Sequence, residues 1–87
     1  MTKKIFILGS KGFVGSSVLS KLKKQNETLV ALSRDNFDFL SLDFVEYMKS
    51  KVHSGDVIIN AAAIAPCKNF DQLRVNAQLI INIQKSI

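Results

Sequence analysis

The stretch Gly9-Ser10-Lys11-Gly12-Phe13-Val14-Gly15 places a glycine at every third position. An apolar run over residues 5–8 precedes it and is typical of a buried strand, whereas apolar side chains recur at helical spacing from Phe13 onward. The sequence therefore predicts a strand, a tight turn and the start of a helix. Such a start leaves backbone N–H groups without intrahelical partners at the positive end of the helix dipole, which favours an anion and most often a phosphate.

Each glycine of this turn has its own expected role. One lets the chain leave the strand at a φ that other residues resist, one lets the backbone approach a pyrophosphate, and one lets helix and strand pack closely. Ordinary surface turns also collect glycine, so the turn alone is a weak signal. A second β-like run, Thr28-Leu29-Val30-Ala31-Leu32, completes a βαβ unit and favours the nucleotide-binding interpretation.

Length and composition limit the classes of protein to consider. The chain has 87 residues, 47% of them hydrophobic, and a formal net charge of +5. No apolar run approaches the roughly 18 residues of a membrane helix, and Met1-Thr2-Lys3-Lys4 leads straight into a strand, so we expect a soluble, cytoplasmic protein that uses no membrane. Its lysine clusters lack interleaved aromatic residues, which argues against a nucleic-acid partner.

Strands and helices alternate along the chain, which is typical of a parallel sheet with right-handed crossovers. We expect an α/β fold, a Rossmann-like doubly wound parallel sheet of about four strands with flanking helices. The predicted strands are 4–8, 28–33, 37–41 and 56–61, and the predicted helices are 13–25, 43–53 and 70–87.

The predicted last helix has an apolar face, and no further strand follows it. We therefore expect residues 1–87 to be the N-terminal part of an NAD(P)-binding Rossmann domain. In that case they form about the first quarter to third of a larger enzyme, whose catalytic and substrate-binding parts are absent from this sequence.

Three further segments follow the glycine turn in order: Leu42-Asp43-Phe44, Asn60-Ala61-Ala62-Ala63 and Val75-Asn76. With them the chain resembles the extended short-chain dehydrogenase/reductase superfamily of NAD(P)-dependent nucleotide-sugar epimerases, dehydratases and reductases. It is most similar to the branch of 4-dehydrorhamnose reductase and GDP-fucose synthase. The resemblance implies a dinucleotide cofactor, a nucleotide-sugar substrate and hydride transfer. It also implies that the pyrophosphate is held by Gly9, Ser10, Lys11, Gly12, Phe13, Val14 and Gly15.

The resemblance also implies an adenine contact after the third predicted strand. Asp43 is expected to hydrogen-bond the adenine amino group, with Phe44 beside the ring. The residues themselves allow another interpretation, since Asp43 and Glu46 have the spacing of a capping box at a helix start. Both roles are compatible.

On the nicotinamide side, the resemblance implies that Ala61, Ala62 and Ala63 pass beside the cofactor, where small side chains let it lie against the backbone. Composition alone equally favours a close helix–strand contact filled by alanines. Asn76 matches a helix asparagine that helps to shape the active site. Its alternative role is to satisfy a buried amide of a neighbouring loop.

The residues at the end of the second predicted strand indicate which dinucleotide the chain binds. NAD enzymes place Asp or Glu there, whereas this chain has Ser33-Arg34. A hydroxyl and a guanidinium suit a 2′-phosphate, and Lys11 is within reach of the same group, so we expect NADP rather than NAD. Asp35 is the objection to this expectation, and we expect it to turn outward with Asn36.

No catalytic residue is assigned. The superfamily uses a Tyr-x-x-x-Lys pair, and Tyr47 and Lys51 have that spacing, but they precede the predicted strand 56–61 whereas the pair follows it; we interpret them as a coincidence. Cys67 is expected to be a spectator, and His53 a dipole partner at a helix end. One histidine and one cysteine make no credible metal site.

The sequence leaves open two alternatives to an enzyme. One is a non-catalytic NAD(P)-binding sensor or regulatory module of Rossmann fold, and the other is a folded relic that binds no cofactor. A homodimer is left open.

Overall fold

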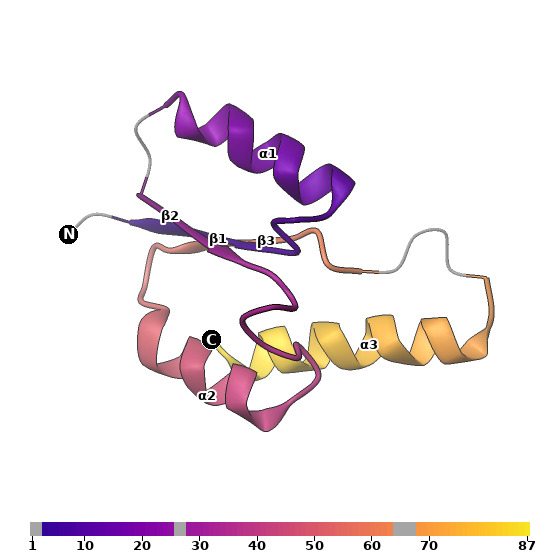
Figure 1. The fold of residues 1–87 in the computed structure, drawn as a ribbon. Helices are drawn as coiled ribbons and strands as arrows, with labels where there is room; N and C mark the ends of the chain where they lie inside the picture. Colours follow the sequence, from indigo (N-terminus) through magenta and orange to yellow (C-terminus); the bar gives the residue numbers. More distant parts are fainter. Residues whose placement is uncertain (1–2, 26–27, 64–67) are drawn as a thin grey trace.

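The computed structural model describes residues 3–25, 28–63 and 68–87. In chain order its elements are β1 (Lys4–Leu8), α1 (Phe13–Lys23), β2 (Thr28–Leu32), α2 (Leu42–Lys51), β3 (Val57–Asn60) and α3 (Phe70–Lys85). The strands form one parallel sheet of order β2-β1-β3. Helix α1 covers one face of the sheet, and α2 and α3 cover the other (Figure 1). The expected α/β class is therefore confirmed as a small parallel sheet with helices on both faces.

The central strand β1 is buried along Ile5, Phe6, Ile7 and Leu8, as its uninterrupted apolar sequence predicts for a strand covered on both faces. Side chains alternate across a strand, so Phe6 and Leu8 share one face. They join the main core cluster with Phe44 and Met48 of α2 and Leu79 of α3. This cluster fixes α2 and α3 against the same side of the sheet.

The strand predicted over residues 37–41 is wrong within the described part of the chain, and the sheet there has three strands rather than about four. Two N–H groups in this segment bond to Asp38 within the segment instead of to β2. The Asp38 side chain accepts from the N–H of Leu40 at 3.0 Å, and the Asp38 carbonyl accepts from the N–H of Ser41 at 2.9 Å. Phe39 turns into the core against Phe44, with ring centroids 5.1 Å apart. The segment is a turn anchored by aromatic packing.

A buried asparagine ties this turn to α3. Asn82, 4% exposed, donates through Nδ2 to the Phe39 carbonyl at 3.0 Å. Its Oδ1 accepts from Nε2 of Gln78 at 2.9 Å, which fixes the orientation of the amide. In a strand, the Phe39 carbonyl would accept a hydrogen bond from the neighbouring strand. Here it accepts one from the side chain of Asn82 in α3 instead.

Asp56 lies at the end of the sheet where the strands begin, and it joins the start of β1 to the start of β3. Its carboxylate accepts from the backbone N–H groups of Lys4 and His53, each at 2.8 Å, and lies 3.1 Å from Nζ of Lys4. These bonds favour the charged form, those from the backbone N–H groups of Lys4 and then His53 most. They lower the pKa of Asp56 from its ordinary 3.8 to about 2.

This shift predicts a pH dependence of stability. Because the pKa of Asp56 is lower in the folded than in the unfolded chain, the unfolded chain binds more protons as pH falls from about 4 to about 2. The stabilisation is complete above that window and is lost within it. We expect Asp56→Asn to lower the urea midpoint at pH 7 and pH 5, and the deficit to shrink at pH 4 and further at pH 3. A deficit that stays constant down to pH 3 would contradict this.

No helix in the described ranges combines the length and the apolar character needed to cross a bilayer. Within the same ranges no three His, Cys, Asp or Glu side chains come together in a way that could hold a metal ion.

Candidate functional site

The carboxyl ends of the three strands lie side by side. Leu8 is in register with Leu32 on one flank and with Asn60 on the other. The first residues after the strands continue the pairing: the Gly9 N–H donates to the Leu32 carbonyl at 2.8 Å, and the Ala61 N–H donates to the Leu8 carbonyl at 2.9 Å. The loop after β1 therefore lies between the loops after β2 and β3. This edge, next to the point where strand order reverses, is where open α/β sheets bind ligands.

One glycine role expected from the sequence, the positive φ, is confirmed at Gly9, and the expected close packing of the helix is found at Gly15 against the turn rather than against a strand. Gly9 has a φ of +83°, and a Cβ there would lie 2.7 Å from the Ala61 carbonyl oxygen. Gly15 is buried in α1, and a Cβ there would lie 2.0 Å from the Gly9 carbonyl oxygen. Gly9 thus provides the left-handed conformation and the close approach of the chain that follows β3, and Gly15 lets the helix pack against the turn itself.

The N-terminus of α1 differs from those of the other helices. Gly12 is its N-cap and supplies no side-chain bond, and its first turn has no acidic residue. Helices α2 and α3 are capped by Ser41 and Asn69, and each has an aspartate in its first turn. Among the described residues, a Cβ on Gly12 would meet the Gly9 carbonyl oxygen alone, at 3.4 Å. This start can accept an anion at its backbone N–H groups.

The other residues of the turn divide between its two sides. Ser10 is buried, and its N–H donates to the Leu32 carbonyl at 3.0 Å. Phe13 and Val14 are exposed at the start of α1, at 94% and 61%. Ser10 therefore supports the turn, while Phe13 and Val14 present apolar surface beside the open N-terminus of the helix.

Two adjoining pockets open at this edge. The first, about 180 Å³, is lined by the glycine turn and the loop after β2: Gly9, Lys11, Gly12, Ser33, Arg34, Asp35, Phe39 and Ala62. The second, about 270 Å³, extends toward α3 and is lined by Arg34, Asp38, Phe39, Leu40, Ala62, Val75 and Leu79. We call them the turn pocket and the helix pocket. Arg34, Phe39 and Ala62 line both, so the two pockets form one track from the glycine turn to α3.

Arg34 is exposed and makes no salt bridge within the described ranges. Ser33, in contrast, is buried at 5%, and its hydroxyl accepts from the N–H of Asp35 at 3.3 Å. Both residues were expected to bind a 2′-phosphate. The structure leaves the Arg34 guanidinium available for this, whereas the Ser33 hydroxyl is hydrogen-bonded within its own turn.

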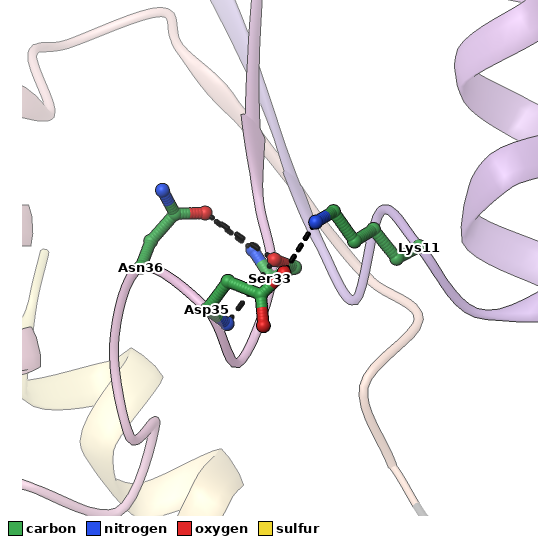
Figure 2. Close-up of polar contacts among 4 residues, drawn as sticks. All are labelled: Lys11, Ser33, Asp35 and Asn36. Carbon is green, nitrogen blue, oxygen red and sulfur yellow. Dashed lines mark hydrogen bonds and ion pairs between the residues drawn. The ribbon is translucent and has the colours of Figure 1, made fainter.

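The expected outward turn of Asp35 is wrong in part. Its side chain is 70% exposed, but it lines the turn pocket and forms an ion pair with Lys11 (Figure 2). The local turn explains this direction, because Asn36 bonds back to Ser33 and leaves Asp35 at the apex, facing the glycine turn. The carboxylate therefore lies on the rim of the site.

Asp43 and Phe44 are not brought to either pocket. Phe44 is completely buried between Phe37 and Phe39, so the expectation that it lies beside an adenine ring is wrong. The helix cap is Ser41, which accepts from the Phe44 N–H at 3.2 Å; Asp43 lies within the first turn and is not the cap. The capping-box interpretation of Asp43 is therefore also wrong, and its adenine contact stays a prediction.

The alanine segment lies partly in a backbone packing contact and partly along the pockets. Ala61 lies against the backbone of Gly9, which is the close packing contact. Ala62 lines both pockets, while Ala63 is exposed beyond them. Asn76 is half-buried on α3, next to Val75 of the helix pocket. A cofactor contact for Ala63 or Asn76 stays a prediction.

The walls of the helix pocket are not among the site residues predicted from the sequence. Asp38, Phe39 and Leu40 reach it because residues 37–41 form a turn rather than a strand, and Val75 and Leu79 reach it from α3. The helical spacing of Val75 and Leu79 was visible in the sequence, but it indicates only a buried face. Nothing in it indicates that the loop after β2 would leave a pocket there.

The described residues to which the sequence assigned no catalytic or metal-binding role lie away from both pockets. Tyr47 packs on Phe37 with ring centroids 4.7 Å apart, and Lys51 is exposed at the end of α2. His53 is exposed beyond α2, where its N–H donates to Asp56. Cys67 lies outside the described residues.

This sheet order, with a glycine turn at the switch point and helices on both faces, is that of a Rossmann-like unit. Comparison with known families matches residues 3–86 to the RmlD substrate binding domain. The match covers nearly the whole chain, and the chain belongs to this family. It confirms the resemblance to the 4-dehydrorhamnose reductase-like proteins. Comparisons with curated proteins and with solved structures found no match.

Proposed function

We propose that this chain binds NADP(H) along the track from the glycine turn to α3 and is the dinucleotide-binding part of a nucleotide-sugar reductase or epimerase/dehydratase. Membership of the RmlD substrate binding domain family supports the nucleotide-sugar class. The observation that carries the proposal is the position of the open N-terminus of α1 beside a pocket that Arg34 also lines.

The residues present fit such a cofactor. The Gly12 N–H already donates to the Gly9 carbonyl at 3.0 Å, so the N–H groups of the first turn of α1, which begins at Phe13, are those that would bind a pyrophosphate. No side-chain cap and no acidic residue in that turn competes with the anion. Phe39, Leu40 and Val75 give the helix pocket an apolar wall suited to an adenine ring. Arg34 lies between the two pockets, where its planar fork suits a 2′-phosphate.

When bound, NADP(H) supplies or accepts a hydride at C4 of its nicotinamide ring. In this proposal the chain binds and orients the cofactor: the glycine turn fixes the pyrophosphate, and Ala61, Ala62 and Ala63 leave room for the nicotinamide half. No residue of this chain is assigned as the proton donor or acceptor.

A calorimetric titration with NADP⁺ and NAD⁺ at fixed salt tests the proposal. We expect NADP⁺ to bind more tightly. Arg34→Ala should weaken the binding of NADP⁺ by roughly 10- to 100-fold, because hydrogen bonds to a charged group contribute about 1.5–3 kcal/mol. NAD⁺, which has no 2′-phosphate, should change little.

The matched control is Arg74→Ala. Arg74 is on α3, its side chain is 74% exposed, and it lines neither pocket. It should leave both affinities unchanged. Absence of heat with either dinucleotide, or an equal loss for both in Arg34→Ala, would count against the proposal.

A further inference from the structure

An ion pair crosses the rim of the turn pocket. Nζ of Lys11, from the glycine turn, donates to Oδ2 of Asp35, from the loop after β2, across 24 positions of sequence. Figure 2 shows the lysine side chain extended toward the loop that carries the carboxylate. Both residues line the turn pocket together with Arg34. The pair therefore joins two walls of the proposed phosphate site.

The two partners are not equally fixed. Ser33 donates its N–H to Oδ1 of Asn36 at 2.9 Å, and its hydroxyl accepts from the N–H of Asp35 at 3.3 Å. This closed turn, anchored by the buried Ser33, sets the direction of the Asp35 side chain. Lys11 has a long stem, 73% exposed, and Asp35 is its one bonded partner among the described residues. The carboxylate is preorganised and the ammonium is free to move.

An entering phosphate would compete with Asp35 for the same ammonium. Both side chains of the pair are largely exposed, and exposed ion pairs stabilise little, so a phosphate that also engages Arg34 can take Lys11 away. The carboxylate then remains at the rim without its cation. Asp35 therefore opposes phosphate binding, because it holds Lys11 beforehand and stands uncompensated near the anion afterwards.

We propose that Asp35 is a specificity-determining residue, which lowers the preference for NADP(H) over NAD(H) by withholding Lys11 from the 2′-phosphate. This inference rests on the proposed function. It assigns Asp35 a role through Lys11, and it assigns no contact between Asp35 and the ribose of NAD.

Titrations of NADP⁺ and NAD⁺ into the wild type, Asp35→Asn, Lys11→Gln and the double variant test the inference. Asp35→Asn should tighten NADP⁺ binding by about fivefold, a small gain in keeping with an exposed pair, and leave NAD⁺ within about twofold. Lys11→Gln should weaken the binding of NADP⁺. In the Lys11→Gln background the gain from Asp35→Asn should be smaller, since no ammonium remains to be released.

The matched control is Asp71→Asn, which removes an exposed carboxylate that also faces a cation, Arg74 at 3.9 Å, but lines neither pocket. It should leave the ratio of the two affinities unchanged. A gain from Asp35→Asn that is equal or larger without Lys11 would overturn the inference, because simple repulsion would then suffice. So would a loss of NAD⁺ affinity in Asp35→Asn.

The inference and the proposed function fail differently. If no variant binds either dinucleotide, the proposed function fails and the inference fails with it. If NADP⁺ binds and the ratio in Asp35→Asn equals that of the wild type, the inference alone is overturned.

Discussion

Replacement of Gly15 by alanine is expected to destabilise the fold strongly. The added Cβ would lie 2.0 Å from the carbonyl oxygen of Gly9, 2.7 Å from its carbonyl carbon and 3.2 Å from Cα of Ser10. All three are backbone atoms of Gly9 and Ser10, whose N–H groups are bonded to Leu32 of β2, so relief of the clash cannot come from rotation of a side chain. Overpacking of a well-packed site costs about 1–3 kcal/mol or more. Against a typical total of about 5–15 kcal/mol, a backbone clash at the upper end removes much of the stability.

Urea unfolding followed by circular dichroism measures this effect, and Gly12→Ala is the matched control. Within the part of the chain that the structure describes, a Cβ on Gly12 meets one atom, the Gly9 carbonyl oxygen at 3.4 Å, so this variant should fold with a urea midpoint near that of the wild type. If the proposed function is correct, it should also bind NADP⁺ more weakly, since the new methyl group stands where the pyrophosphate approaches. Equal midpoints for Gly15→Ala and the wild type would contradict the packing argument.

The glycine turn could be predicted from sequence because its determinants are local. The spacing of Gly9, Gly12 and Gly15 requires only a strand before it and a helix after it, and each is visible in the apolar pattern. The positive φ of Gly9 and the burial of Gly15 follow from that arrangement. The parallel pairing of the strands is likewise predicted once strands and helices alternate.

Residues 37–41 could not be predicted in the same way, because tertiary contacts decide their conformation. Phe37 and Phe39 alternate with Asp38 as in a strand, but the Asp38 side chain closes a turn and Asn82 of α3 takes the Phe39 carbonyl. A partner 43 positions away leaves no local signal. The helix pocket depends on this turn, so the sequence did not indicate its walls.

The Lys11–Asp35 pair shows the same limit within the site itself. The sequence places a cation in the glycine turn and a carboxylate after β2, and each is readily noticed alone. That they meet depends on the register of Leu8 with Leu32 and on the turn closed by Ser33 and Asn36. Residue types could be predicted here, whereas their pairing required the structure.

Replacement of Phe44 by alanine is the second change with a large expected effect, and it separates a core role from a ligand role. Phe44 is 0% exposed and packs edge-on against Phe37 and Phe39, with ring centroids 6.3 and 5.1 Å away. Loss of a buried phenylalanine side chain costs about 3–5 kcal/mol, because the cavity adds to the lost transfer free energy. Urea unfolding should show a large drop in the midpoint, or a chain without a cooperative transition.

Phe44→Leu and Leu42→Ala complete this test. Phe44→Leu keeps most of the apolar volume, so it should fold with a smaller loss of stability and bind NADP⁺ within about twofold of the wild type. Leu42→Ala, at the start of the same helix but 70% exposed, should change the midpoint little. If Phe44→Leu instead weakens NADP⁺ about tenfold while its urea midpoint stays near the wild-type value, the aromatic ring contacts the cofactor and the core assignment of Phe44 is wrong.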